Sequence, residues 1–190
     1  MRRFSYTARM TKEFAARRLD VKAFAEEAGQ ISGTGTLAEY PRLMAETQER
    51  GAGLAVQWAA RGELRNAQHP NPEVWLHLNG STVLPLTCQR CLAPVDSPVE
   101  IDRTFRFVAD EETAAAQDDE AEEDLLVLSR SFDLLELVED EILMELPVAP
   151  RHDVCPEPVK MAVADPEFDD QQAAKDNPFA LLKQLKTPKQ

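Results

Sequence analysis

Two pairs of soft metal ligands are present in this sequence, and each pair has a spacer of two residues. The first pair is the Cys-x-x-Cys motif Cys88-Gln89-Arg90-Cys91, and the second is His152 with Cys155. A tight turn brings two such ligands to the roughly 2.3 Å that zinc requires of sulfur, and a second pair completes a tetrahedral site. Cys88, Cys91, His152 and Cys155 are therefore candidate ligands of a Cys₃His zinc site.

Two other interpretations of these residues stay open. Three cysteines in a reducing compartment can be plain thiols with no cofactor, and His152 can be an ordinary surface side chain. A dithiol redox motif of the thioredoxin type would open a helix after a strand. This motif instead ends a strand in a sheet that lacks crossover helices. The sequence thus predicts either no cofactor or zinc.

Other patterns typical of enzymes are scarce, so we predict that the protein is not an enzyme. Neither a phosphate-binding glycine loop followed by Gly-Lys-Ser/Thr nor a Gly-x-Ser-x-Gly motif is present. A magnesium site would need the carboxylates of residues 133 and 139–141 to converge. Asp140 and Glu141 are adjacent, however, and adjacent residues diverge by about 100° around a helix.

The charge of the chain is acidic overall and unevenly placed. There are 21 Lys and Arg against 34 Asp and Glu, a net charge of -13. Residues 1–22 nevertheless hold seven basic and two acidic residues, whereas residues 110–124 hold nine acidic residues and no basic one. An acidic surface repels phosphate backbones and attracts basic partners. We expect the partner-binding residues to be Arg2, Arg3, Arg17, Arg18, Arg90, Glu139, Asp140 and Glu141.

The hydrophobic pattern predicts helices in the first 50 residues and a sheet after them. Helices are expected over residues 12–19, 21–28 and 37–48, interrupted by glycines at 29, 33 and 35. Thr36 and Glu39 have the spacing of a capping box. From residue 53 the period becomes two, which predicts an antiparallel sheet over residues 54–108. Asn79-Gly80 indicates a hairpin turn within it, and Pro85 indicates a strand edge or bulge.

The last third of the chain alternates between acidic and apolar stretches. Residues 109–124 are so densely acidic that we expect a disordered loop, followed by a strand over residues 125–128. Asp133 caps a predicted acidic helix at about 134–146, with one apolar stripe and one anionic face. Residues 151–190 are predicted to be a tail rich in proline and acid that ends in a short helix and a basic C-terminus.

These elements define an α+β fold. We expect an antiparallel β-sheet, a partly closed barrel or sandwich-like, with N-terminal helices and one acidic helix at about 134–146. The predicted parts are a basic helical segment (1–50), a core (51–150) and a tail (151–190). The start of the chain lacks the apolar region of a signal peptide, and no stretch is long and apolar enough to cross a bilayer. We therefore expect a cytoplasmic protein that does not bind membranes.

Several blocks of this sequence resemble the YceD family of bacterial large ribosomal RNA subunit accumulation proteins. The stretch 86–92 is similar to a family signature in which a strand ends in Cys-x-Arg-Cys, and residues 133–150 resemble its acidic helix running into Leu-Pro-x-x-Pro. His152 and Cys155 follow, and residues 177–182 with their lysine tail resemble the ending of some members. Some relatives have a fuller second cysteine pair, which this chain lacks.

The resemblance implies a role in 23S rRNA accumulation and assembly of the large (50S) subunit. From the uneven charge we interpret the protein as a non-enzymatic adaptor in that process. Its partners would be precursor ribosomal RNA, a basic ribosomal protein of the large subunit, or both. Two alternatives belong to other classes: a metal-dependent rRNA-processing enzyme, and an acidic chaperone for a basic ribosomal protein. The oligomeric state stays unknown at this level.

Overall fold

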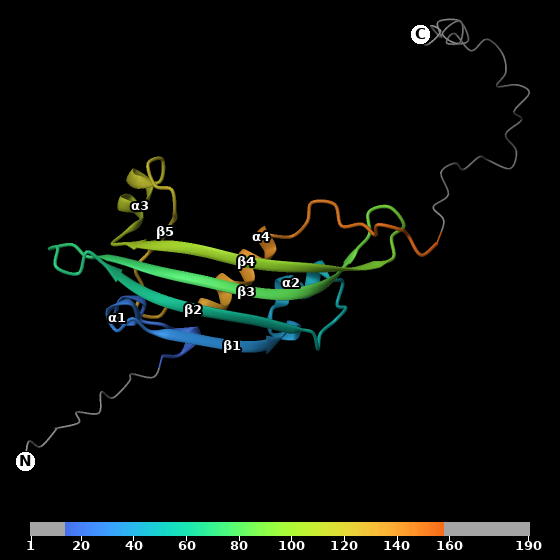
Figure 1. Ribbon diagram of the computed structural model, residues 1–190, viewed down its shortest axis with the longest axis horizontal. Helices are drawn as coiled ribbons and strands as arrows, with labels where there is room; N and C mark the ends of the chain where they lie inside the picture. Colours follow the sequence, from blue (N-terminus) through green and yellow to red (C-terminus); the bar gives the residue numbers. More distant parts are fainter. Residues whose placement is uncertain (1–13, 158–190) are drawn as a thin grey trace, which may run out of the picture. The chain divides into compact units, whose positions relative to one another are not determined.

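The computed structural model describes residues 14–157 (Figure 1). In chain order the elements are η1 (Ala16–Arg18), α1 (Val21–Glu26), β1 (Gln30–Thr36), η2 (Leu37–Glu39), α2 (Pro41–Glu46), β2 (Ala55–Arg65), β3 (Glu73–Thr87), β4 (Pro94–Val108), α3 (Glu111–Gln117), β5 (Asp124–Val127) and α4 (Leu134–Met144). The five strands form one sheet in the order β1-β2-β3-β4-β5, antiparallel except for the parallel pair β4–β5. The predicted α+β class is confirmed, and the sheet is open.

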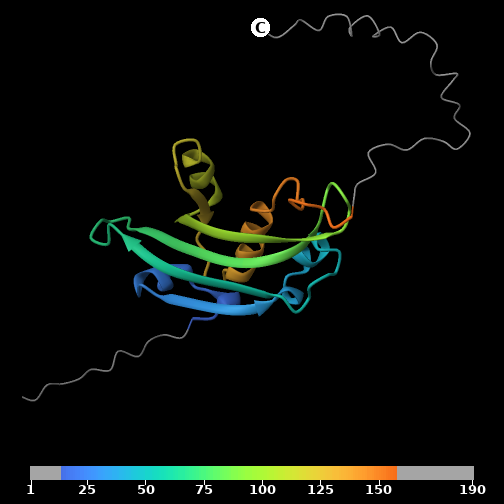
Figure 2. The same cartoon turned by 45° about the vertical axis from the view of Figure 1, so that its right-hand side comes forward.

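Helices cover one face of the sheet, and no helix within residues 14–157 covers the other. In both views α4 lies behind the strands (Figures 1 and 2). Alternate residues of β2 and β4 point toward the helices, as the period of two predicted. The buried side chains include Val56, Leu76, Leu78, Phe105, Leu134, Val138 and Ile142. Each such side chain contributes about 1.5–3 kcal/mol of hydrophobic stabilisation, so the apolar stripe of α4 is a main part of the core.

The hairpin predicted at Asn79-Gly80 is wrong. β3 runs without interruption from Glu73 to Thr87, and Gly80 pairs with Trp58 on one side and with Ile101 on the other. A type I′ turn needs positive φ at both central residues, and neither Asn79 nor Gly80 has it. Gly80 serves close strand packing instead, because a Cβ there would lie 2.9 Å from the carbonyl oxygen of Gln57.

Pro85 lies where the sequence predicted it, at a strand edge. β2 pairs with β3 only as far as Ser81, so the β2 side of β3 has no strand partner at Pro85. The missing N–H of proline therefore breaks no ladder bond. Arg50 donates to the carbonyl oxygen of Pro85 at 3.1 Å and to the Thr87 hydroxyl at 2.9 Å, which closes this edge with a side chain.

The N-terminal region contains a strand that sequence periodicity did not indicate. Residues 30–36, read as a glycine-rich break, form β1 and pair with β2 across the predicted boundary at residue 50. Gly33 permits this because a Cβ there would lie 2.6 Å from the Trp58 ring. The helices are correspondingly short, and the capping box of Thr36 and Glu39 opens the 3₁₀ turn η2. Residues 14–155 thus belong to one compact unit.

The acidic segment that we expected to be a disordered loop contains α3 and leads into β5. Asp110 caps α3 by accepting from the Thr113 N–H at 2.8 Å, and acids in the first turn suit the positive end of the helix. Arg106 of β4 donates to Gln117 at 3.0 Å and pairs with Glu123. One strand arginine therefore offsets part of the charge repulsion that the sequence suggested. The predicted C-terminal helix and basic tail lie outside the described residues.

Gly62 is a position where the fold cannot accept a side chain. A Cβ at Gly62 would lie 2.8 Å from the carbonyl oxygen and 2.7 Å from a ring carbon of Phe24, the fully buried aromatic residue of α1. We expect Gly62→Ala to lower the free energy of unfolding by about 1–3 kcal/mol, because α1 must shift off β2. Gly53→Ala is the control, since nothing lies within 4 Å of its Cβ. Equal urea midpoints for the two variants would contradict this packing.

Candidate metal centre

The connection between β3 and β4 forms the first half of the candidate site. β3 ends at Thr87 and β4 begins at Pro94, so Cys88 and Cys91 both lie in this turn. The Cys88 N–H donates to the Ala93 carbonyl at 2.9 Å, and the Leu92 N–H donates back to the Cys88 carbonyl at 2.9 Å. Leu92 has a φ of 63°, in the left-handed region. The turn therefore closes tightly and directs both sulfurs to one side.

The segment after α4 returns to this turn and supplies the second half. The Gln89 N–H donates to the Pro150 carbonyl at 2.8 Å. Arg90 donates to the carbonyl oxygens of His152 at 2.8 Å and Asp153 at 3.1 Å. These bonds join residues about 60 positions apart in the chain, so they fix His152 and Cys155 beside the cysteine turn.

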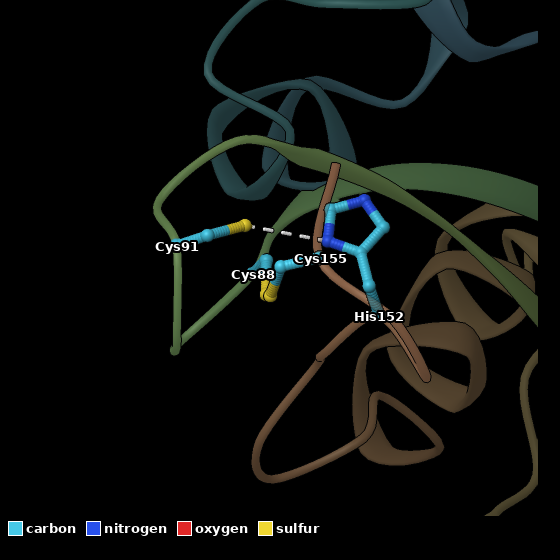
Figure 3. Close-up of side chains that lie close together, drawn as sticks. All are labelled: Cys88, Cys91, His152 and Cys155. Atoms are coloured by element: carbon cyan, nitrogen blue, oxygen red, sulfur yellow. Dashed lines mark hydrogen bonds between the residues drawn. The ribbon is translucent and has the colours of Figure 1, made fainter. Parts of the chain in front are cut away.

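The four predicted ligands converge in space, which confirms that part of the sequence analysis (Figure 3). The three Sγ atoms and one ring nitrogen of His152 all lie within 4.8 Å of one another. Cys91 Sγ lies 3.4 Å from Nδ1 of His152. Cys88 is buried and the other three are half-buried. Within residues 14–157 this is the one group of three or more such side chains gathered closely enough for a metal ion.

The two cysteines of the turn have opposite electrostatic environments. Burial raises the pKa of the Cys88 thiol, but the backbone N–H groups of Arg90, Cys91 and His152 outweigh it and lower the pKa to about 5. For Cys91 the Ala93 N–H lowers the pKa, yet burial and the neighbouring sulfurs raise it overall. The turn thus stabilises one thiolate with backbone donors, while a second negative charge beside it is disfavoured without a cation.

The donor set fits a closed metal site. Three thiolates and one imidazole form the Cys₃His set that structural zinc sites use, and four protein ligands fill a tetrahedral shell. A catalytic zinc needs a position for water or substrate, and this set leaves none. The arrangement can therefore hold a metal that fastens two loops together, and it is poorly suited to activating a water molecule.

Arg90, predicted to contact a partner, is used within the chain. Besides its two carbonyl partners, its Nε donates to Cys155 Sγ at 3.1 Å, and this bond with the neighbouring thiols raises the pKa of Arg90. The guanidinium is exposed but committed to the candidate site. Its observed contacts position the second ligand pair and place a positive charge beside the thiolates.

The acidic residues of α4 also have partners inside the chain. Glu139 is only 6% exposed and accepts from the backbone N–H groups of Arg42 and Leu43. Asp140 pairs with the guanidinium of Arg42, and Glu141 pairs with Arg103 at 3.1 Å. Burial raises the pKa of Glu141, and Arg103 opposes that shift. The predicted anionic face is thus partly an internal contact surface.

The basic residues of the predicted interface are only partly described. Arg17 lies 3.7 Å from Asp133, the cap of α4, and Arg18 is exposed without a recorded acidic partner in residues 14–157. Arg2 and Arg3 lie outside the described residues. Partner binding by these four arginines stays a prediction.

Sequence reasoning missed the buried carboxylate of Glu139, although a signal was present. The apolar stripe of α4 includes Leu135, Val138 and Ile142, and Glu139 lies at the i+4 position from the first and i−3 from the last. Residues at this spacing share one helix face. An acid within an apolar stripe predicts a buried partner, and that partner is the start of α2.

The described fold and site define a class of protein: a small α+β body with a Cys₃His cluster at one end of an open sheet. Within the described residues no helix is long and apolar enough to cross a bilayer. A family model described as large ribosomal RNA subunit accumulation protein YceD matches residues 76–186. The chain belongs to the YceD family, which is a ribosome-biogenesis family by that description. No solved structure matches the chain.

Proposed function

We propose that this protein is a non-enzymatic cytoplasmic adaptor that supports 23S rRNA accumulation and assembly of the large ribosomal subunit. We also propose that Cys88, Cys91, His152 and Cys155 bind one structural zinc ion. The match to the YceD family supports the first proposal. The complete four-ligand set, which joins the β3–β4 turn to the segment after α4, supports the second. Bound zinc would hold these loops in one arrangement, while the protein itself supplies the binding surface.

The loops that the zinc would join carry apolar side chains exposed to solvent. Leu92 in the β3–β4 turn is 74% exposed, and Val154, between two candidate ligands, is 85% exposed. Fixing exposed apolar groups in one conformation reduces the entropy lost on binding. This end of the sheet is therefore suited to contact a macromolecule, which supports an adaptor role.

Two alternatives make different predictions about the same surface. A metal-dependent rRNA-processing enzyme needs an open metal position, which the closed ligand set does not favour. An acidic chaperone needs only a basic protein client and no RNA contact. Deleting residues 1–13, which contain Arg2 and Arg3, separates the adaptor from the chaperone, because only the adaptor should lose affinity for RNA.

Association with precursors of the large subunit should depend strongly on salt. We expect full-length protein to sediment with these particles at low ionic strength and to lose roughly tenfold in affinity between about 50 and 200 mM salt. The physical reason is that the separate acidic and basic segments would bind their partners by electrostatic attraction, which dissolved salt screens. Gradient sedimentation at several salt concentrations, followed by immunoblotting, measures this. Binding that does not change with salt would contradict the electrostatic part of the proposal.

A control in the same experiment addresses catalysis. Purified protein of known metal content is incubated with precursor rRNA, and the RNA termini are mapped. The adaptor proposal expects intact RNA even when the protein carries one zinc per chain. Metal-dependent cleavage would overturn it in favour of the processing enzyme.

A further inference from the structure

The face of the sheet opposite α4 is hollowed. A depression of about 750 Å³ crosses β1, β2, β3 and β4 on this side. A second hollow of about 500 Å³ adjoins it and shares Asn79 and Asp102 with it. Most residues that line the larger hollow are small or neutral and polar, among them Ser32, Thr34, Gln57, Asn79 and Ser81. The smaller hollow is also lined by Arg61 and His77. No described helix covers this face (Figures 1 and 2).

Carboxylates without partners follow β4 along one side of this face. Asp96, Glu100 and Asp102 occupy alternating outward positions of the strand and are all exposed. Within residues 14–157 none of their side chains forms a hydrogen bond or an ion pair. Glu100 and Asp102 both line the larger hollow. These three acids therefore give one side of the hollowed face a negative potential.

The arginines on outward strand positions pair with acids other than Asp96, Glu100 and Asp102. Arg61 and Arg65 both pair with Glu63, at 3.6 and 2.9 Å. Arg106 pairs with Glu123. Arg61 and Arg65 share one carboxylate, and Arg61 also lines the smaller hollow with Asp102, so these arginines offset part of the negative charge of the face. The charge of Asp96, Glu100 and Asp102 remains available to cations from outside the described body.

The groups on this face match the donors of lysine and arginine. Carboxylates, amide oxygens and hydroxyls all accept hydrogen bonds, and a guanidinium or ammonium only donates them. Strands lie about 4.8 Å apart, so the hollow extends about 15 Å from β1 to β4. An extended polypeptide rises about 3.3 Å per residue, and four or five residues cover that distance. Phosphate-rich RNA would be repelled by the same acids.

We propose that the uncovered face of the sheet binds an extended lysine- and arginine-rich segment of a protein partner, with its basic side chains on Glu100 and Asp102 and its backbone across β1 to β3. This inference rests on the proposed function, because it assigns the basic partner of the adaptor to a surface. The contact with the basic partner is thereby assigned to the sheet and not to α4, whose acids have partners within the chain.

The test measures binding of a labelled ten-residue peptide of alternating arginine and serine to the full chain by fluorescence anisotropy at low salt. The double variant Glu100→Gln with Asp102→Asn removes two charges from the face while keeping side-chain shape. The control Glu27→Gln with Glu46→Gln removes two exposed charges from residues at the ends of α1 and α2. We expect about tenfold weaker binding for the face variant and less than twofold for the control.

Each other outcome contradicts the proposal in a different way. Equal losses for both variants would mean that the peptide senses only net charge, and unchanged binding would mean that it docks elsewhere. Affinity that rises on deleting residues 1–13 would assign the face to the chain's own basic segment. Concentration-dependent dimerisation that the face variant abolishes would assign it to a second copy. Thermal melts of both variants verify folding.

Failure of this inference and failure of the proposed function are distinguishable. Sedimentation with large-subunit precursors tests the function, whereas the peptide tests the face. If the wild type sediments with particles and the face variant binds the peptide normally, the assignment of the binding face is wrong and the proposed function stands. If the peptide results hold but the wild type never sediments with particles, the function is wrong.

Discussion

Removal of the proposed zinc ion should lower the thermal midpoint of this protein by about 10 °C. A ligand that binds only the folded state at about a thousandfold above its dissociation constant stabilises it by roughly 4 kcal/mol, which for a chain of this size is about 8–16 °C. The effect is large because the site joins two segments distant in sequence, the β3–β4 turn and residues 150–155. Calorimetric melts with and without a chelator, beside metal analysis of the purified protein, measure it.

Single substitutions then locate the ion. Cys155→Ser should reduce the zinc content of the protein to well below one per chain and give the melting temperature of chelated wild type, with no further decrease on adding chelator. Asp153→Asn is the matched control, because it lies between two candidate ligands and only its backbone carbonyl is used, by Arg90. If the purified wild type contains no metal and a chelator does not change its melting temperature, the three cysteines are ordinary thiols.

The ligand set was predictable because it depends on residue types at fixed spacing. Two pairs of cysteine or histidine ligands with two-residue spacers can be recognised in the sequence, whichever fold brings the pairs together. The interactions that bring them together were not predictable, because the bond from the Gln89 N–H to the Pro150 carbonyl involves backbone atoms alone. Arg90 shows the same limit, since an arginine between two cysteines gives no sign that it will bind the carbonyls of residues 152 and 153.

The strands were predictable where apolar and polar side chains alternate. They were not predictable where a glycine permits close packing of the strand. β2 and β4 have clear alternation, and the structure follows it. Gly33 and Gly80 have no side chains, so their sequence context suggests breaks or turns. Each instead permits close packing in mid-strand, Gly33 against the Trp58 ring and Gly80 against the backbone of Gln57. Close packing depends on which strand becomes the neighbour, and the local sequence does not indicate that neighbour.

Glu139 connects the part of the chain outside the family match to the part inside it. α2 lies before residue 76, and Tyr40, the N-cap residue that precedes it, provides no side-chain cap. The Glu139 carboxylate of α4 takes that place, accepting from the N–H groups of Arg42 at 2.7 Å and Leu43 at 3.2 Å. Helix starts leave such donors without partners, and a buried N–H without a partner costs about 1–3 kcal/mol. One acid from a distant helix therefore caps α2.

Glu139→Ala should accordingly lower the free energy of unfolding by about 3 kcal/mol, which corresponds to a thermal midpoint lower by roughly 6–12 °C. The substitution leaves two backbone donors without an acceptor and removes one of the two carboxylates that pair with the Arg42 guanidinium, the one at 3.1 Å. Urea denaturation followed by circular dichroism gives the value directly. Asp140→Ala is the neighbouring control: its side chain is 46% exposed and pairs only with Arg42, so it should cost less than about 1 kcal/mol. If the two substitutions cost the same, Glu139 stabilises the fold through surface charge alone, and α2 must find its cap elsewhere.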